Sequence, residues 1–586
     1  MTADSLTQIL LLASVLAPVV TALALMFPRG RAVVQRFAPL AAVPAVWLAL
    51  FGVPEASVSL PWVLTHVVLT LDGTGRVFLG FTSVLWLASA WYARGYLAKD
   101  AEPIRFWVFF LAAMAGNFGL ILAADIPTFY VGFALMGVAS AGLVLHRGDA
   151  EAVRAGRVYM ALAMIGEVML LTGLSWLAVK AGTTDLHALP REAFSPLVLG
   201  LVLVGFGIKA GALCLHFWLP LAHPAAPVPA SAVLSGAMIK AGLLGWLRFL
   251  PLGDAALPEI GLTLVAMGLG AAFLGAVAGV TQKNPKTVLA YSSISQMGII
   301  TVGVGAGLAR PEAWGGILAA VLVYAVHHGL AKGALFLGVT LAHSAAGRTA
   351  VWWTRLGLLI PALALAGAPF SSGAVAKLGL KSEIAFLPGA WVDWVSFLLP
   401  LAATGTTLMM ARFLWLVWPR TNAPTEPLAA GTRLPWAFLV VAVVVGVWLL
   451  PGTLTWLPAK LMPAMLWKAT WPLLFGGALA WLGAKLQARF PARRRHGIPA
   501  GDMAVWFEKL AALLPRPNAP PAQEHHGQDE DVAMESTGGT ARIFALLKER
   551  ALRLEQGLRG WSVVGFAILL LLAVSLWLLA GNRPGD

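Results

Sequence analysis

Ionisable side chains occur inside long apolar stretches of this sequence, where a charge is costly and usually indicates function. Lysine is the repeated choice, at Lys209, Lys240, Lys332 and Lys377. Burial favours the neutral form of a lysine and a nearby carboxylate favours the charged form, so such a residue can load and release a proton. An arginine would stay charged. The chemistry predicted from these positions is proton exchange.

Histidine and glutamate lie in the same apolar stretches, and histidine adds a group that titrates between the other two types. His328 lies four residues before Lys332, and His216 lies seven residues after Lys209. Each pair is therefore expected to share one face of a helix. The candidate proton-transfer residues are Lys209, Lys240, His328, Lys332, Lys377, Glu167, His216 and His327.

Each candidate could instead be a structural charge that reaches the membrane surface or pairs with a neighbour. The four mid-span lysines together favour proton transfer, whereas Lys381 and Glu383 lie near a span end and fit the structural alternative. His327 and His328 are adjacent and point about 100° apart on a helix, which argues against haem. We find no phosphate-binding loop, zinc spacing or CxxC, so no cofactor or metal is expected.

The composition places these residues in a membrane protein. Of 586 residues, 59% are hydrophobic and 12% are charged, against about 45–50% and 25% in soluble domains. These values exclude a soluble or disordered chain, and the single cysteine, Cys214, excludes a disulfide scaffold. The net charge of +14 is expected to orient the protein in a bilayer rather than to bind nucleic acid.

Sixteen apolar runs are long enough to be membrane-spanning helices. They cover residues 7–27, 37–54, 77–93, 106–124, 127–145, 158–179, 196–218, 230–250, 258–281, 287–308, 315–342, 356–385, 394–418, 435–452, 469–485 and 561–580. Strands of a membrane barrel would alternate in polarity and be about half as long. The expected fold class is an all-α polytopic membrane protein.

Basic residues alternate between the predicted loops. The loop after the fifth span carries Arg147, Arg154 and Arg157, for example, whereas the next loop carries only Lys180 and Arg191. Basic loops face the cytoplasm. The sequence therefore predicts a multi-pass protein of the cell (inner) membrane with both termini outside the cytoplasm.

Two spans contain helix-breaking segments, LPLAHPAAPVPAS in the seventh and GAPFSSG in the twelfth. Breaks at corresponding places indicate repeats around a transport site. We therefore predict two inverted five-helix repeats, with Lys209 and Lys377 at matching positions. The expected domains are N-terminal helices (1–104), the first repeat (105–255), the second repeat (256–420), C-terminal helices (421–487), a cytoplasmic polar loop with a lateral amphipathic helix (488–560), and a final anchor helix (561–586).

At these motifs the sequence resembles the antiporter-like membrane subunits of respiratory complex I, membrane-bound hydrogenases and multisubunit cation/proton antiporters. The resemblance covers about residues 80–420 and rests on FGIKAGALCLHFWLPLAHPAAPVPASAVLSGAMIKAGLLGWLRF, NPKTVLAYSSISQMGI and HHGLAKGALFLG. Within the family, the segment HPAAPVPASAVLSGAMIKAG most resembles the large membrane subunit of formate hydrogenlyase and hydrogenase-4 type complexes. The amphipathic helix at 540–559 and the last span resemble a short form of the lateral arm in the complex I subunit.

The resemblance implies a role for each matched position. Lys209 would be the central carrier of a first half-channel, and Lys240 the lysine of the eighth helix. His328 and Lys332 would connect the two halves, and Lys377 would be the exit residue.

The sequence departs from the family pattern at two positions. Ala134 stands where the fifth span usually has a glutamate, and Cys214 stands where proline is usual. The standard carboxylate–lysine pair is therefore absent. Either Glu167 replaces it from the sixth span, or the first half-channel works differently or not at all.

The expected function is translocation of protons, or of sodium ions, by a subunit of a redox-driven membrane complex. Its partners would be other membrane subunits and the lipid bilayer, and those subunits would carry out the electron chemistry of an NADH–quinone oxidoreductase or hydrogenase type complex. Alternatives are a subunit of a cation/proton antiporter without redox chemistry, the membrane partner of an inorganic-carbon uptake complex, and a non-conducting scaffold. These functions differ in their partners, so the sequence leaves them open.

Overall fold

A computed structural model describes residues 3–61, 66–419, 430–450, 463–489 and 498–505. Contacts divide the chain into one unit of Met1–Ser59 with Val68–Phe507 and a second of Leu60–Val67 with Glu508–Asp586. The site described below lies entirely within the first unit. The predicted amphipathic helix at 540–559 and the predicted last span at 561–580 lie outside the described residues.

The chain forms α-helices and one short pair of strands, β1 (Ser57–Leu60) and β2 (Val67–Thr70). The helices of the first half are α1 (Ala3–Ala24), α2 (Pro28–Phe37), α3 (Val43–Phe51), α4 (Gly73–Tyr96), α5 (Pro103–Leu122), α6 (Ile126–Val144), α7 (Ala150–Ala181), α8 (Pro196–Ala210), α9 (Leu219–Ala225), α10 (Val228–Val233) and α11 (Ile239–Phe249). The later helices are α12 (Pro258–Thr281), α13 (Pro285–Ala309), α14 (Trp314–Ser344), α15 (Arg348–Ala366), α16 (Ser372–Glu383), α17 (Trp391–Val417), α18 (Arg433–Val445) and α20 (Pro463–Arg489).

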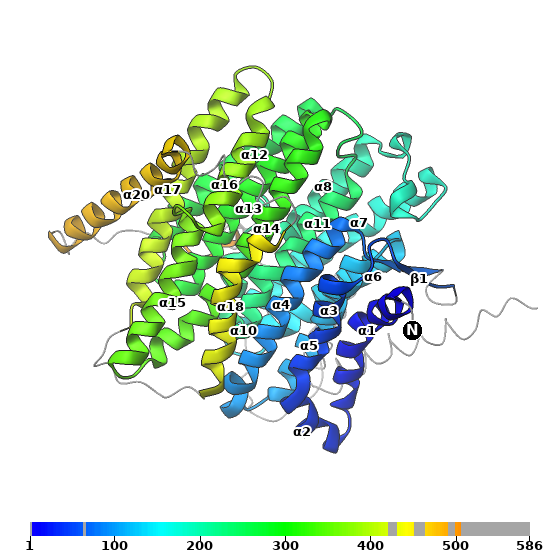
Figure 1. Cartoon of the computed structure of the whole chain (residues 1–586), viewed down its shortest axis with the longest axis horizontal. Helices are drawn as coiled ribbons and strands as arrows, with labels where there is room; N and C mark the ends of the chain where they lie inside the picture. Colours follow the sequence, from blue (N-terminus) through cyan, green and yellow to red (C-terminus); the bar gives the residue numbers. More distant parts are fainter. Residues whose placement is uncertain (1–2, 62–65, 420–429, 451–462, 490–497, 506–586) are drawn as a thin grey trace, which may run out of the picture. The chain divides into compact units, whose positions relative to one another are not determined.

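Eleven helical segments among the described residues are long and apolar enough to cross a membrane, and α8 and α18 are shorter apolar helices. Figure 1 shows these helices running side by side. The predicted all-α polytopic fold is confirmed, whereas the total of sixteen spans and the repeat relationship remain predictions.

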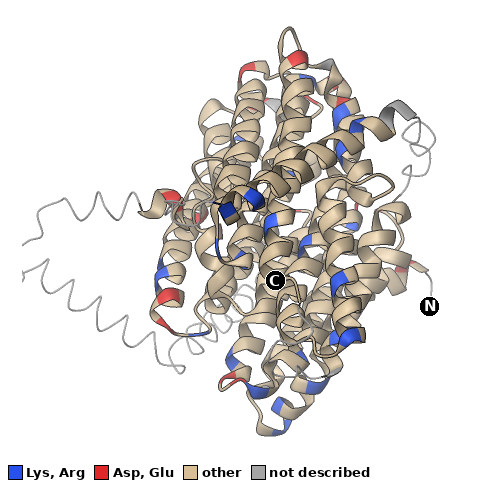
Figure 2. Cartoon of the chain, turned by 90° about the vertical axis from the view of Figure 1, so that its left-hand side faces the viewer, with Lys and Arg blue, Asp and Glu red and all other residues tan. Residues whose placement is uncertain are grey.

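The surface of the bundle suits a bilayer. Charged residues gather toward the helix ends, and fewer lie between them (Figure 2). Large aromatic side chains are exposed instead, with Trp352, Trp353, Trp394, Trp415 and Trp481 each more than half accessible. Lipid is the medium in which such a surface is stable.

Helices α12 and α13 pack backbone to backbone because glycines face each other across their contact. A methyl group added to Gly268 would lie 2.5 Å from the carbonyl oxygen of Gly298, and one added to Gly261 would lie 2.5 Å from that of Gly305. Small residues at such spacing let membrane helices approach closely. This packing buries α13 completely and fixes the polar side chains that it carries.

Two helix breaks lie where the sequence predicts broken spans, but their details differ from the expectation. The first runs from Gly211, at φ +73°, to Trp218, so it precedes most of the proline-rich stretch. The second runs from Gly367 to Ser371, between α15 and α16. Lys209 comes before its break and Lys377 comes after its own, so the two lysines do not occupy the matching positions that we expected.

A buried ion pair joins the start of α4 to the end of α11. Asp72 caps α4 by accepting a hydrogen bond from the Gly75 amide at 2.5 Å. The same carboxylate binds Arg248, whose Nη2 is 3.1 Å from Oδ1, and both side chains are nearly inaccessible. Arg248 also donates to the carbonyl oxygen of Ile121 at 3.3 Å. One carboxylate therefore links three helices.

We predict that Asp72→Ala lowers the stability of the purified protein strongly, because it leaves Arg248 buried without its charge partner. Loss of one member of such a pair costs about 3–5 kcal/mol, and loss of a helix cap adds about 1 kcal/mol. Asp72→Asn keeps the cap and should be less damaging. Thermal unfolding in detergent measures the order of the two variants. The control is Glu312→Gln, which removes an exposed pair with Arg310 and should change little.

Candidate functional site

Lys209 lies in the last turn of α8, directly before the first helix break, and is 5% exposed. Its Nζ donates to the Tyr159 hydroxyl at 2.9 Å, and that hydroxyl donates to the carbonyl oxygen of Gly137 at 3.1 Å. Nζ also lies 5.5 Å from the ring centre of Phe133 and 5.2 Å from that of Tyr159. Aromatic faces stabilise a cation at such distances.

Glu167 on α7 reaches the same point of the bundle as Lys209. A methyl group on Gly137 of α6 would lie 2.4 Å from Glu167 Oε1 and 3.4 Å from Lys209 Nζ. The two groups therefore converge over Gly137, one helical turn after Ala134. With Phe133 and Tyr159 they line a small cavity of about 10 Å³, which is roughly the space of one water molecule. Because Gly137 has no side chain, the Glu167 carboxylate can occupy the space beside it.

The outer face of α7 beside this pocket is apolar and exposed. Met164, Ile165, Val168 and Leu171 are each at least half accessible, while Glu167 between them is partly buried. The acid therefore lies at the boundary of the bundle rather than at its centre.

A second group of ionisable residues lies in the centre of the bundle with no exposed side-chain surface. Lys240 Nζ donates to the carbonyl oxygen of Ser235 at 2.6 Å, within a π-helical turn at Leu234–Met238. Such a turn leaves backbone carbonyls free of their usual partners. Lys332 on α14 donates to the carbonyl oxygen of Leu289 on α13 at 2.8 Å, and not to His328 as their spacing would allow.

Two histidines lie among these lysines. His328 interacts electrostatically with Lys240, Lys332 and His327, and His223 interacts with Lys240 and Lys332. Both are fully buried, and neither ring nitrogen of either residue has a hydrogen-bond partner among the described residues. Buried polar atoms are satisfied by water when protein groups do not reach them. The two imidazoles therefore lie among the lysines with their ring nitrogens unpaired by the described protein groups.

The row of buried polar residues continues to the second helix break. His327 Nδ1 lies 2.9 Å from the hydroxyl of Ser372, the first residue of α16. Lys377 on the same helix donates to the carbonyl oxygens of Leu365 and Ala366, at 2.7 and 3.1 Å. These carbonyls end α15, where the helix dipole favours a cation. Lys377 also lines a cavity of about 70 Å³ with Lys381 and Lys468.

The structure brings seven of the eight predicted site residues into these two groups, and it corrects the expectation for the eighth. His216 does not share a helix face with Lys209, because the helix breaks at Gly211 between them. Its imidazole lies in the unwound stretch before α9, and Nε2 is 3.2 Å from Oδ2 of Asp502.

Several polar residues of the site were not predicted from the sequence. Tyr159 and His223 are the main ones, and the motif HPAAP contains the latter. Tyr324 donates to Gln296 Oε1 at 2.8 Å, and Gln296 donates to Thr406 at 2.9 Å, so an amide network supports the histidines of α14. The sequence signal for His223 was its place at the start of HPAAP, a motif with two prolines that follows the span containing Lys209.

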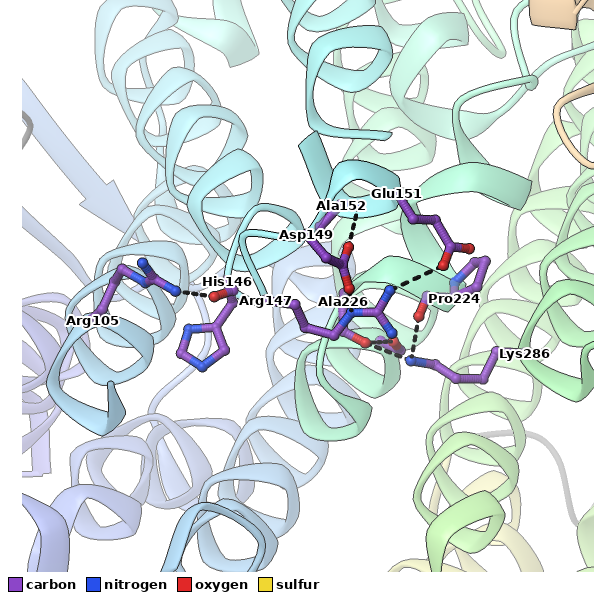
Figure 3. A network of polar contacts seen from close by, with 10 residues as sticks. Arg105, His146, Arg147, Asp149, Glu151, Ala152, Pro224, Ala226 and Lys286 are labelled. Carbon is purple, nitrogen blue, oxygen red and sulfur yellow. Dashed lines mark hydrogen bonds and ion pairs between the residues drawn. The ribbon is translucent and has the colours of Figure 1, made fainter. Parts of the chain in front are cut away.

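Lys286 holds the end of the broken helix. Its Nζ donates to the carbonyl oxygens of Pro224 and Ala226, at 3.2 and 2.5 Å (Figure 3). The same view shows Arg147 paired with Glu151 at the start of α7, with Nη2 and Oε2 at 3.2 Å. The end of α9, and with it His223, is therefore fixed by a lysine of α13.

The comparison with known proteins agrees with this geometry. A family described as NADH:quinone oxidoreductase/Mrp antiporter, transmembrane, matches residues 123–409, which include Glu167, Lys209, Lys240, the histidines and Lys377. This segment, just under half of the chain's 586 residues, is similar to the membrane subunits that the family describes. The match ends before Asp502.

Relatives of this chain are named for two different systems, an antiporter and a hydrogenase. The chain is 31% identical to antiporter subunit mnhA2 of Staphylococcus saprophyticus, over 55% of this chain and 44% of the relative. It is 29% identical to hydrogenase-4 component B of Escherichia coli, over 50% of this chain and 46% of the relative. The matched segment thus spans less than half the length of these curated relatives.

Solved structures share the fold. The Mrp complex from Dietzia sp. DQ12-45-1b aligns with a TM-score of 0.73 and 21% identity, over 98% of this chain and 63% of that one. The membrane-bound sulfane sulfur reductase, an archaeal respiratory membrane complex, aligns with a TM-score of 0.61 and 19% identity, over 80% and 99%. Both are multisubunit membrane complexes.

We predict that Lys209→Met increases the reaction of Glu167 with a hydrophobic carbodiimide, because the protonated carboxyl group donates its proton to the carbodiimide nitrogen and its oxygen then adds to the central carbon. Removing the nearby positive charge favours the neutral acid in a partly buried site. Mass spectrometry of the labelled protein measures the yield at Glu167. Lys180→Met, at the exposed end of the same helix as Glu167, is the control and should leave the yield unchanged. Equal labelling in both variants would show that Lys209 does not influence the acid.

Proposed function

We propose that this subunit translocates protons through its buried row of lysine, histidine and glutamate residues, as part of a multisubunit membrane complex. The observation that carries the proposal is the set of fully buried histidines, His223 and His328, placed between lysines and lacking protein partners for their ring nitrogens. A buried charge with a structural role is paired with another group, whereas proton translocation needs a row of groups that can each take up and release a proton. The placement of His223 and His328 between lysines supports such a row.

In the first half, Glu167 and Lys209 exchange a proton over Gly137. The acid stabilises the charged lysine, and its protonation releases the lysine proton toward the centre. The convergence of the two groups supports an active first half over a scaffold, because Glu167 fills the role left open by Ala134.

In the centre, the proton passes between Lys240, Lys332 and the histidines through water. His327 then links this group to Ser372 and the broken span that holds Lys377. Lys377 is the exit residue in this scheme, because it adjoins the larger pocket near the end of the route. The first and second repeats, at 105–255 and 256–420, would each hold one half of this route.

The partners and the orientation are parts of the same proposal. Relatives that are named for a hydrogenase and an antiporter support a subunit of a larger complex, in which other subunits supply the driving reaction. The leading assignment is a redox-driven complex. A cation/proton antiporter is the second candidate, favoured by the mnhA2 relatives and the Mrp fold match. In this scheme the subunit lies in the cell inner membrane, and both of its termini face away from the cytoplasm.

We predict that Glu167→Gln reduces proton translocation by the reconstituted complex to about a tenth or less, because acid–base exchange ceases at this site. Adding a carboxylate at the usual family position, Ala134→Glu, should restore part of the rate in the Glu167→Gln background. Gly200→Ala, at a helix position with open space around it, is the control for substitution in the same region. Normal translocation by Glu167→Gln would remove the carboxylate from the first half of the route.

We predict that His223→Leu slows translocation by about ten-fold or more while the complex still assembles, because the side chain keeps its volume but loses its proton site. The same change at His187, which is exposed in a loop, should leave the rate unchanged. Dye-monitored proton uptake into proteoliposomes measures both variants. A His223→Leu complex with the wild-type rate would exclude this histidine from the route.

A further inference from the structure

A segment beyond the membrane-spanning helices docks onto the first helix break. This docked segment comprises residues 498–505 and follows α20. Gln282 Nε2 donates to the carbonyl oxygen of Ile498 at 2.9 Å, and the Tyr291 hydroxyl donates to that of Pro499 at 3.4 Å. Gly501, at φ +79°, lies so close to Leu221 that an added methyl group would be 2.8 Å from it. Residues of α9, α13 and the α12–α13 loop thus hold the segment.

The docked segment brings one carboxylate into the protein. Asp502 Oδ2 lies 3.2 Å from His216 Nε2 and accepts a hydrogen bond from the Tyr291 hydroxyl at 3.3 Å. Its Oδ1 accepts from the Met503 amide at 2.5 Å. The His216 side chain is fully buried, whereas that of Asp502 is 12% exposed. The carboxylate therefore joins a buried imidazole to the edge of the bundle.

The other ring nitrogen of His216, Nδ1, is buried and has no hydrogen-bond partner among the described residues. The imidazole stands in the unwound stretch that begins two residues after Lys209, and its Cβ is 4.0 Å from the position of a methyl group on Gly211. One nitrogen thus contacts an acid at the edge of the bundle, and the other is buried, without a partner among the described residues, in the stretch that follows Lys209.

We propose that Asp502 and His216 form the proton-entry relay of the first half of the route. This inference rests on the proposed proton translocation and adds a residue that lies outside the matched family segment. Protonated Asp502 transfers its proton to Nε2 of His216, giving an imidazolium and a carboxylate. The imidazolium then releases the proton on Nδ1 to water near Lys209. The Asp502 carboxylate takes up a new proton from the water at the edge of the bundle. The ring regains its first tautomer by exchange through water.

The groups around Asp502 suit this role. His216 and the Tyr291 hydroxyl are the titratable side chains in contact with the carboxylate among the described residues. An acid bonded to an imidazole orients the ring and selects which nitrogen carries the proton. The alternative is that Asp502 serves only as a latch for the docked segment, which predicts that any residue with the same shape would suffice.

The test compares Asp502→Asn with Asp502→Glu in the reconstituted complex. Asparagine keeps the size and an acceptor for Tyr291 but carries no exchangeable acid proton, whereas glutamate keeps the acid. We expect asparagine to lower proton uptake about ten-fold or more and glutamate to retain a large part of it. Asp393→Asn, which removes an exposed carboxylate from the start of α17, is the control and should behave as wild type.

Hydrogen exchange of residues 498–505 separates the relay from a latch. In the relay, Asp502→Asn leaves the backbone protection of the docked segment intact while uptake falls. Wild-type uptake by Asp502→Asn overturns the relay. So does a loss of protection in Asp502→Asn that Asp502→Glu restores in step with uptake, because uptake would then follow docking alone.

A measurement without transport keeps this inference separate from the proposed function. Infrared difference spectra of the purified complex between two pH values should contain a carboxyl band that Asp502→Asn removes and His216→Gln shifts. If the wild-type complex moves no protons, the proposed function fails, and the band still reports whether the pair exchanges a proton. If the complex moves protons and the spectra contain no such band, the relay is wrong.

Discussion

A cation inside an apolar helix bundle needs partners within that bundle, and this requirement accounts for the irregular parts of the structure. Lys240 binds a carbonyl oxygen in a π-helical turn, and Lys377 binds the two that end α15. Lys286 binds the carbonyl oxygens of Pro224 and Ala226 at the end of α9. In a regular helix the backbone carbonyl oxygens accept hydrogen bonds from backbone amides of the same helix. Helix breaks and wide turns therefore provide the free carbonyl oxygens that a lysine can bind. Each of these lysines therefore lies where an irregular stretch of helix supplies carbonyl oxygens for its ammonium group.

The exchange of a carboxylate between neighbouring helices follows from the same requirement. Ala134 leaves α6 without an acid at this position, and in the proposed scheme Glu167 supplies one from α7. The exchange works only because Gly137 has no side chain in the space that the Glu167 carboxylate fills. An acid can move from one helix to another if a glycine opens opposite it, and the lysine can remain where it is. The pair is thus defined by a point in space and not by a position in one span.

Much of this arrangement could be predicted from the sequence. Apolar runs located the helices, and Glu167 and the lysines stood out because charge is rare in such runs. The details that depend on tertiary packing could not be predicted. Tyr159 is an ordinary aromatic residue until Lys209 reaches it, and Asp502 lies 286 residues from the histidine that it binds. The first break came earlier than the prolines indicated, because Gly211 can adopt the left-handed conformation that ends α8.

The exposed outer face of α7 gives the position of Glu167 a thermodynamic meaning. Anything that covers Met164, Ile165 and Val168 replaces lipid at the edge of the Glu167 pocket and so changes the relative stability of the neutral and the ionised acid. By linkage, a proton on Glu167 must then change the affinity for whatever covers that face by the same factor. Binding of a partner at the outer face of α7 and protonation of Glu167 are therefore thermodynamically linked.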